Sequence, residues 1–247
     1  MKITERIHLV GSGRMGFDMT DALDCHVYLL DGGDEYALID TGAGRDVDQI
    51  LERARDDGLD TGRIRHILLT HAHADHSGGA AELRERLKDV VVAASAETAT
   101  MVGSGDETQI SLYDARRAGA YPEDYRFTPF EVDQRLEEGD RYRVGGLELE
   151  VMATPGHASD QLSFILRDDR GVSVFSGDTL FEGGRVILQD IWNCSVQDSC
   201  RSIEKLHALR FDGFYPGHRG FSVQRGLKHA EAAMKNITQL VPPEQLT

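Results

Sequence analysis

Residues 70–79 run Thr-His-Ala-His-Ala-Asp-His-Ser-Gly-Gly and place three histidines and one aspartate within six positions. The apolar residues 67–69 come directly before this stretch, and a helix-like run follows the two glycines. A cluster of imidazoles at the end of a strand is a donor set that a borderline metal such as zinc prefers. The stretch therefore predicts part of a metal site, and its remaining ligands must come from elsewhere in the chain.

Length and composition favour one sizeable globular domain. A chain of 247 residues, 40% apolar and 28% charged, is long enough for a sizeable α/β core. No stretch rich in Pro, Gly or Ser separates the halves, so a single domain over residues 1–247 is expected. The net charge of −15 argues against nucleic acid as the partner, because that affinity is built from Lys and Arg contacts.

The cysteines and the N-terminus favour a cytoplasmic protein. The chain has three cysteines, an odd and sparse count that predicts free thiols rather than a disulfide framework. Residues 1–6 contain no apolar core of a signal peptide, and no apolar run approaches the roughly 20 residues of a membrane span. We therefore expect a cytoplasmic location and no membrane partner.

The pattern of apolar residues predicts strands with helices on their outer sides, in an order that occurs twice. In the first half we expect strands at 3–10, 25–31, 35–40, 63–69 and 90–94. The helices expected there are at 46–57 and 79–87. In the second half we expect strands at 141–144, 147–153, 161–167 and 172–176. The helices expected there are at 197–209 and 222–240.

Residues 95–130 depart from this pattern. They predict two short helices, at about 96–102 and 107–118, followed by an aromatic loop that contains prolines. We interpret the segment as a helical insertion that either covers a pocket or pads the surface.

A glycine-rich motif near the N-terminus is only weak evidence for a dinucleotide-binding site. Residues 11–16 match G-x-G-x-x-G, the turn that opens the helix of a dinucleotide site. No helical periodicity follows in residues 17–24, so a flexible loop between two strands is the better interpretation.

Four more polar residues follow apolar strands in the same way as the histidine cluster. A histidine follows Thr-Pro-Gly at 157, an aspartate follows Ser-Gly at 178, and another histidine follows Tyr-Pro-Gly at 218. Asp40 ends the strand expected at 35–40. Loops at one edge of a rigid sheet are where ligands are usually gathered, so these side chains are expected to share a cleft with the cluster.

This set of separated motifs resembles the metal-binding pattern of the metallo-β-lactamase superfamily, and the match covers most of the chain. The resemblance implies an α/β fold, the four-layer αβ/βα sandwich, with two metal sites at one edge. It assigns His71, His73 and His157 to the first metal and Asp75, His76 and His218 to the second, with Asp178 bridging them. Asp40 resembles the aspartate that orients a histidine ligand from outside the coordination shell.

The chemistry implied is hydrolysis with two divalent ions, zinc above all, with iron or manganese as alternatives. The resemblance implies a small-molecule substrate, namely a small carboxylic ester, lactone or thioester, whose carbonyl would be attacked by a hydroxide bridging the metals. Asp75 is the candidate for moving a proton. A homodimer is left open by the sequence.

Two groups within the superfamily bear on the substrate. Residues 177–184 are similar to the glyoxalase II group, which cleaves glutathione thioesters, and Arg185 is then the candidate that holds glutathione. The segment around His157 and the helical insertion are similar in style to acyl-homoserine lactonases, but Phe181 stands where those carry a tyrosine. Two alternatives stay open: an iron-dependent persulfide dioxygenase, which closely resembles glyoxalase II, and a phosphodiesterase.

Overall fold

The computed structural model describes residues 1–246 and divides them into two compact units. The first unit contains residues 1–136 and 144–146, and the second contains residues 137–143 and the described chain from 147 onward. Each unit has its own sheet and its own helices, as the duplicated order in the sequence predicts.

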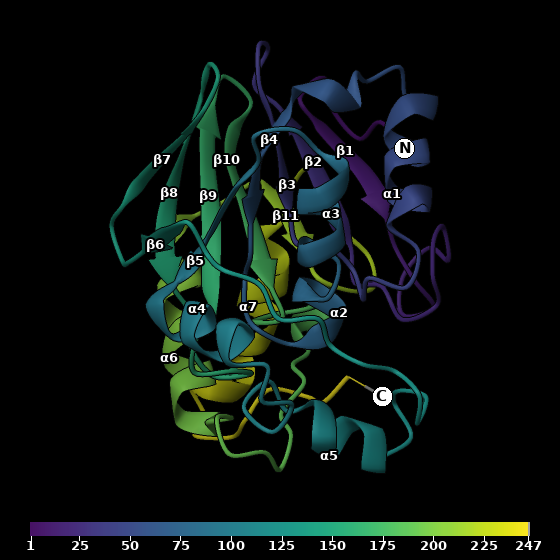
Figure 1. Cartoon of the computed structure of the whole chain (residues 1–247). Coiled ribbons are helices and arrows are strands. Elements are labelled where there is room, and N and C mark those ends of the chain that lie inside the picture. Colours follow the sequence, from purple (N-terminus) through teal and green to yellow (C-terminus); the bar gives the residue numbers. More distant parts are fainter. Residues whose placement is uncertain (247) are drawn as a thin grey trace. The chain divides into compact units, whose positions relative to one another are not determined.

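The sheet of the first unit has six strands in sequential order (Figure 1). They are β1 (Ile7–Gly11), β2 (Val27–Asp31), β3 (Tyr36–Ile39), β4 (Ile64–Leu68), β5 (Val91–Ser95) and β6 (Gln134–Leu136). The first two pairings are antiparallel and the following three are parallel. The helical elements of this unit are α1 (Val47–Asp56), the short η1 (Thr61–Arg63), α2 (Ala74–Ser77), α3 (Ala80–Arg86), α4 (Ala96–Ser104) and α5 (Leu112–Arg117).

Helix α1 shows how the sequence builds this unit. Asp46 caps its start, where the carboxylate accepts a hydrogen bond from the backbone N–H of Gln49. The helix buries an apolar stripe with helical spacing, consisting of Val47, Ile50, Leu51 and Ala54. The stripe belongs to one apolar cluster with alternate residues of the strands, such as Val27 and Leu29 of β2. Figure 1 shows α1 and α3 beside the sheet.

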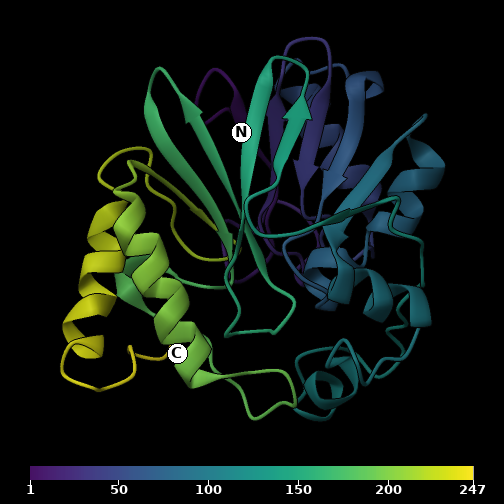
Figure 2. The ribbon, with the colours of Figure 1, turned by 90° about the vertical axis from the view of Figure 1, so that its left-hand side faces the viewer.

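The sheet of the second unit has five strands in the order β11-β10-β9-β8-β7. They are β7 (Arg141–Val144), β8 (Leu147–Ala153), β9 (Leu162–Asp168), β10 (Gly171–Gly177) and β11 (Gly213–Pro216). The helical elements are the short η2 (Glu182–Gly184), α6 (Val196–Leu209) and α7 (Leu227–Ile237). Helices α6 and α7 lie side by side, as Figure 2 shows, and bury Ile203, Leu206 and Ala233 in a cluster with strand residues such as Ile165.

The expected elements occur with shifts at their ends, and a few differ. The closing helix spans 227–237 rather than 222–240, because Ser222 pairs with Phe214 of β11 and Arg225 has a φ of 58°. Strand β6 was not predicted, since it is only three residues long and two of these are exposed. The second helix of the insertion begins at Leu112 rather than at 107, because turns occupy the residues before it.

The glycine-rich segment at 11–16 begins with the last residue of β1 and continues into the loop between β1 and β2, as predicted. Hydrogen bonds tie the loop to itself: Gly13 N–H donates to the carbonyl of Asp24, and Met19 N–H donates to that of Ser12. A Cβ atom on Gly13 would lie 2.6–2.7 Å from three backbone carbonyl oxygens of residues 21–24. Close packing of the loop therefore explains the glycine at position 13, and no bound nucleotide is needed to explain it.

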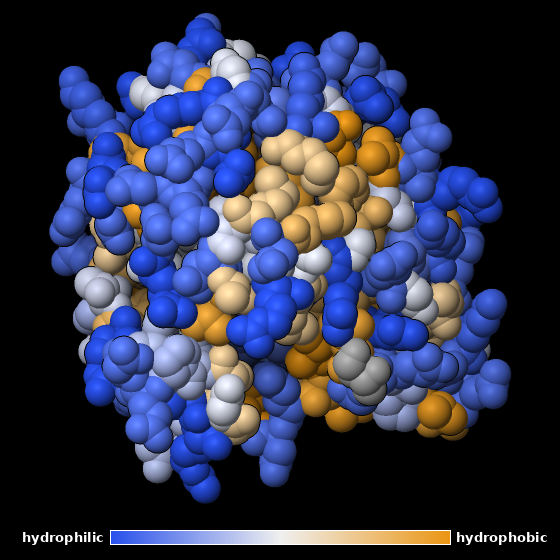
Figure 3. Space-filling model, turned by 90° about the vertical axis from the view of Figure 1, so that its right-hand side faces the viewer, coloured by the Kyte–Doolittle hydropathy of each residue, from blue (hydrophilic) through white to orange (hydrophobic). Residues whose placement is uncertain are grey.

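Most side chains on the face drawn in Figure 3 are hydrophilic, and apolar side chains are exposed between them in several separate places. Among residues 1–246, every helix is too short or too polar to cross a membrane.

Candidate metal centre

Parallel pairing of β3 and β4 brings Asp40 to the start of the histidine loop. Ile39 pairs with Leu68, so both strands end at the same edge of the first sheet. The backbone N–H of Asp40 donates to the carbonyl of Leu68 at 2.9 Å, and the N–H of Thr70 donates back to the Asp40 carboxylate at 2.8 Å. The loop that carries the histidines is therefore fixed to the sheet where it begins.

The Asp40 carboxylate orients two histidines. Its Oδ2 lies 2.8 Å from Nδ1 of His76, and a carboxylate only accepts, so Nδ1 carries the proton. Thr70 Oγ1 donates to the same oxygen at 2.8 Å, which leaves Oγ1 to accept from Nδ1 of His71 at 3.0 Å. Both imidazoles then have their lone pair on Nε2, so that this atom can serve as a metal ligand.

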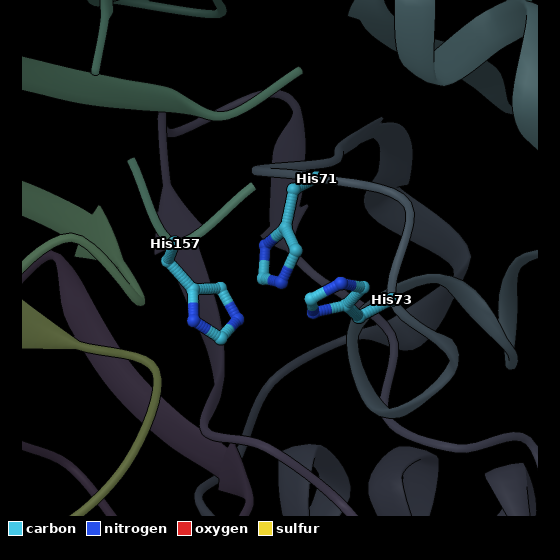
Figure 4. Close-up of side chains that lie close together, drawn as sticks. All are labelled: His71, His73 and His157. Atoms are coloured by element: carbon cyan, nitrogen blue, oxygen red, sulfur yellow. The ribbon is translucent and has the colours of Figure 1, made fainter. Parts of the chain in front are cut away.

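The three histidines of this loop lie together. Ring centroids are 4.6 Å apart for His71 and His73 and 4.1 Å apart for His71 and His76. His71 and His76 are fully buried, and Figure 4 shows the rings of His71 and His73 at the loop after β4. His73 caps the one-turn helix α2, and Ser77 Oγ holds the turn by donating to the carbonyl of Ala72.

Asp75, also in α2, has a neighbour that the sequence did not assign. Its Oδ2 lies 3.6 Å from Nε2 of His76, and its Oδ1 accepts a hydrogen bond from the Tyr121 hydroxyl at 3.0 Å. Burial and the negative charge of Asp75 raise the pKa of Tyr121 well above its usual value, so the hydroxyl stays protonated and donates.

Strand ends also gather the candidates of the second unit. Strands β10 and β11 are parallel, so Asp178 and His218 follow at the same edge of their sheet. The backbone N–H of Gly217 donates to the carbonyl of Gly177 at 2.8 Å and ties the two loops together. Strand β8 is antiparallel to β9, which is antiparallel to β10, so β8 also ends there and presents His157.

Asp178 lies between the two histidines of this unit. Its Oδ2 is 3.6 Å from Nε2 of His157 and 3.5 Å from Nε2 of His218, and all three side chains are buried. Nδ1 of His157 donates to the backbone carbonyl of Ile187 at 2.8 Å, so its lone pair is also on Nε2. A carboxylate oxygen close to two imidazole nitrogens is a donor set that a divalent cation can bind.

The donor chemistry of both sets fits divalent metals. Imidazole nitrogen and carboxylate oxygen are the ligands of zinc sites. A hydroxyl, a carboxylate and a backbone carbonyl accept from Nδ1 of His71, His76 and His157 respectively, which leaves the lone pair of each ring on Nε2. Burial of so many titratable groups without a cation to bind would be costly.

Phe181 and Arg185, the two residues expected near a substrate, lie on either side of η2. Phe181 is fully buried, with its ring centroid 6.1 Å from that of His218. Arg185 is exposed, and its backbone carbonyl accepts from the N–H of Phe181 at 2.8 Å.

Sequence reasoning missed Thr70 and Tyr121. Thr70 is the first residue of the histidine-rich stretch at 70–79, and its place just after a strand could have suggested a hydrogen bond to Asp40. Tyr121 lies 46 residues after Asp75, and no spacing rule links them.

Comparisons with known proteins agree on one family. A family model described as the metallo-beta-lactamase superfamily matches residues 20–218. A hydroxyacylglutathione hydrolase of Rhodopseudomonas palustris is 36% identical over 157 residues, 63% of this chain and 49% of that protein. An atrochrysone carboxyl ACP thioesterase of Cryptosporiopsis is 26% identical over 191 residues, 74% of this chain and 49% of that protein. The chain thus spans about half the length of these curated relatives.

A solved structure shows the same fold. A metallo-β-lactamase of Cronobacter sakazakii superposes with a TM-score of 0.73 at 23% identity, covering 97% of this chain and 96% of that one. With two sheets, each accompanied by helices, this likeness confirms the predicted fold class.

Proposed function

Because the chain belongs to the metallo-β-lactamase superfamily, we propose that it is a metal-dependent hydrolase that cleaves a small thioester, carboxylic ester or lactone. The relatives described above are named for hydrolysis of acyl-glutathione and of an acyl carrier protein thioester. A thioester is therefore the first substrate class to test.

The proposed centre holds two divalent ions, zinc before iron or manganese. His71, His73 and His157 bind the first ion, and Asp75, His76 and His218 bind the second. Asp178 serves both. The observation that carries this proposal is the position of Asp178 Oδ2, at 3.6 Å and 3.5 Å from the Nε2 atoms of His157 and His218, which are assigned to different ions.

The chain's own residues have separate tasks in this proposal. When bound, the two ions supply Lewis acidity for the carbonyl oxygen and for a water molecule. Asp40 keeps His76 in the tautomer that leaves Nε2 available, and through Thr70 it does the same for His71. Asp75 takes up or delivers a proton. The exposed Arg185 guanidinium offers a cation to a carboxylate of the substrate, such as those of glutathione.

The test combines metal analysis with a substrate panel. We expect about two divalent ions per chain and hydrolysis of acyl-glutathione or another thioester, an ester or a lactone. His73→Ala and His157→Ala should each reduce kcat/KM at least 1,000-fold, on the order seen when essential catalytic groups are removed, while circular dichroism shows an intact fold. Full turnover by both variants would rule out the metal mechanism.

Other results of the same panel identify the alternatives. One iron per chain with oxygen uptake on a persulfide would replace the proposal by a dioxygenase. Hydrolysis of phosphodiesters alone would replace it by a phosphodiesterase.

Further proposals concern organisation. The family model spans parts of both compact units, which supports treating the chain as one domain with a helical insertion at about 95–130. A cytoplasmic location and a homodimer remain predictions.

A further inference from the structure

Hydrogen bonds hold the helical insertion together and tie its aromatic loop to the rest of the first unit. Arg116 forms two hydrogen bonds with the Glu107 carboxylate, at 2.9 and 3.1 Å, and one with the carbonyl of Tyr125 at 2.8 Å. The Tyr125 hydroxyl donates to the carbonyl of Ala43 at 2.7 Å. The rings of Tyr121 and Tyr125 lie 5.0 Å apart, so the two hydroxyls belong to neighbouring side chains of the insertion.

Tyr121 uses its hydroxyl on a candidate metal ligand. The hydroxyl donates to Oδ1 of Asp75 at 3.0 Å, while Oδ2 of the same carboxylate lies 3.6 Å from Nε2 of His76. The two oxygens of Asp75 therefore have different neighbours. Oδ1 accepts a hydrogen bond from Tyr121 of the insertion, and Oδ2 lies near Nε2 of His76.

We propose that Tyr121 is a positioning residue of the metal centre, which holds Oδ1 of Asp75 so that Oδ2 faces the second metal ion. The inference rests on the proposed function, because it needs Asp75 to be a ligand. It gives the insertion a role beyond covering the surface, namely to set the affinity of one of the two ions.

The physical reason is the freedom of a carboxylate. The terminal torsion of Asp has a broad energy profile, so an Asp ligand without a second partner samples orientations that do not bind the ion. A neutral donor on the outer oxygen restricts this rotation and removes no negative charge from the site. Loss of such an outer partner typically weakens metal binding about 10- to 100-fold.

Tyr121→Phe tests the inference, with Tyr125→Phe as the matched control. Each change removes one hydroxyl from neighbouring rings, but only Tyr121 donates to Asp75. Stripped protein is titrated with Co²⁺ and with Zn²⁺ against a chromophoric chelator, and visible absorption follows the Co²⁺ geometry. We expect Tyr121→Phe to weaken the second binding step about 10-fold or more and to change the Co²⁺ spectrum. Tyr125→Phe should stay within about twofold of the unmodified chain.

A double-mutant cycle with Asp75→Ala separates positioning from general packing. Without the carboxylate, Tyr121→Phe should no longer alter metal affinity. Equal affinities of Tyr121→Phe and the unmodified chain, or an equal loss in the presence and absence of the carboxylate, would overturn the inference. If the unmodified chain binds no metal at all, it is the proposed function that fails.

Discussion

Single side chains decide the protonation of the proposed ligands, and Asp40 is the main example. Both of its carboxylate oxygens accept: one from the N–H of Thr70, the other from Nδ1 of His76 and from Thr70 Oγ1. Its backbone has a φ of 61°, a left-handed conformation that Asp and Asn tolerate better than other residues with a side chain. The sequence predicted that Asp40 orients a histidine, and the structure gives it contact with one histidine and, through Thr70, with another.

Asp40→Asn should weaken metal binding about 10- to 100-fold. An amide has only one accepting atom, so its NH₂ group must face either Thr70 N–H or Nδ1–H of His76. Metal affinity measured by competition with a chelator checks this. Asp46→Asn, at the cap of α1, removes the same charge and should leave the affinity unchanged, because Asn caps a helix equally well. An Asp40→Asn protein with unaltered affinity would contradict the proposed role.

His229, which is not among the proposed metal ligands, contributes to the stability of the fold. The backbone N–H of Gly183 donates to Nδ1 of His229 at 3.0 Å, and Nε2 lies 2.9 Å from the Ser222 hydroxyl. Burial, with a contribution from Lys228, lowers the pKa of His229 to about 4. Protonation of Nδ1 would break the bond from Gly183, so the folded protein keeps this ring neutral.

This fixes the sign of a pH effect. The unfolded chain, with a histidine pKa near 6.5, binds the proton more readily than the folded chain does. The contribution to stability is therefore complete above about pH 6.5 and is lost as the pH falls towards 4, by roughly 2–3 kcal/mol. Urea unfolding of the unmodified chain and of His229→Gln should show curves that converge at low pH. Parallel curves would show that His229 does not titrate on unfolding.

At the scale of elements, strands place the site and turns present it. Strands β3, β4, β8, β10 and β11 each end within four residues of a candidate residue. The sequence predicted these strands because apolar runs with turn residues behind them are strong local signals. It missed β6 and shortened or extended several helices, because short exposed strands and helix ends depend on contacts distant in sequence.

The turn before His157 offers a test. Gly156 has a φ of 148°, and an added Cβ would lie 2.4 Å from the Cα of Ser199 in α6. Gly156→Ala should cost about 2–4 kcal/mol of stability and displace His157. Gly139→Ala is the matched control: its φ of 89° is also unfavourable for alanine, but nothing lies within 4 Å of the added atom. Its cost should be about 1 kcal/mol, with metal binding retained. Equal losses in chemical unfolding would contradict the packing argument.

At the scale of the whole molecule, bound metal should contribute to stability. A ligand that binds only the folded state at 100 times its Kd adds about 2.7 kcal/mol per site. In a chain of this size, 1 kcal/mol corresponds to roughly 2–4 °C, so chelation should lower Tm by about 5–10 °C per ion lost. Calorimetry before and after EDTA treatment measures the change, with zinc-saturated EDTA as the control. A protein that loses its metal without any change in Tm would contradict this expectation.

The sequence by itself determined the family resemblance, the order of strands and helices, and the set of proposed ligands. These follow from local patterns: a turn after an apolar strand needs only a few neighbouring residues to be recognised. Only the tertiary structure decided that Thr70 links Asp40 to His71, that Asp178 lies between His157 and His218, and that Tyr121 donates to Asp75. Such contacts join residues whose separation along the chain carries no periodic signal, and they exist because strand pairing and the folded insertion bring distant loops together.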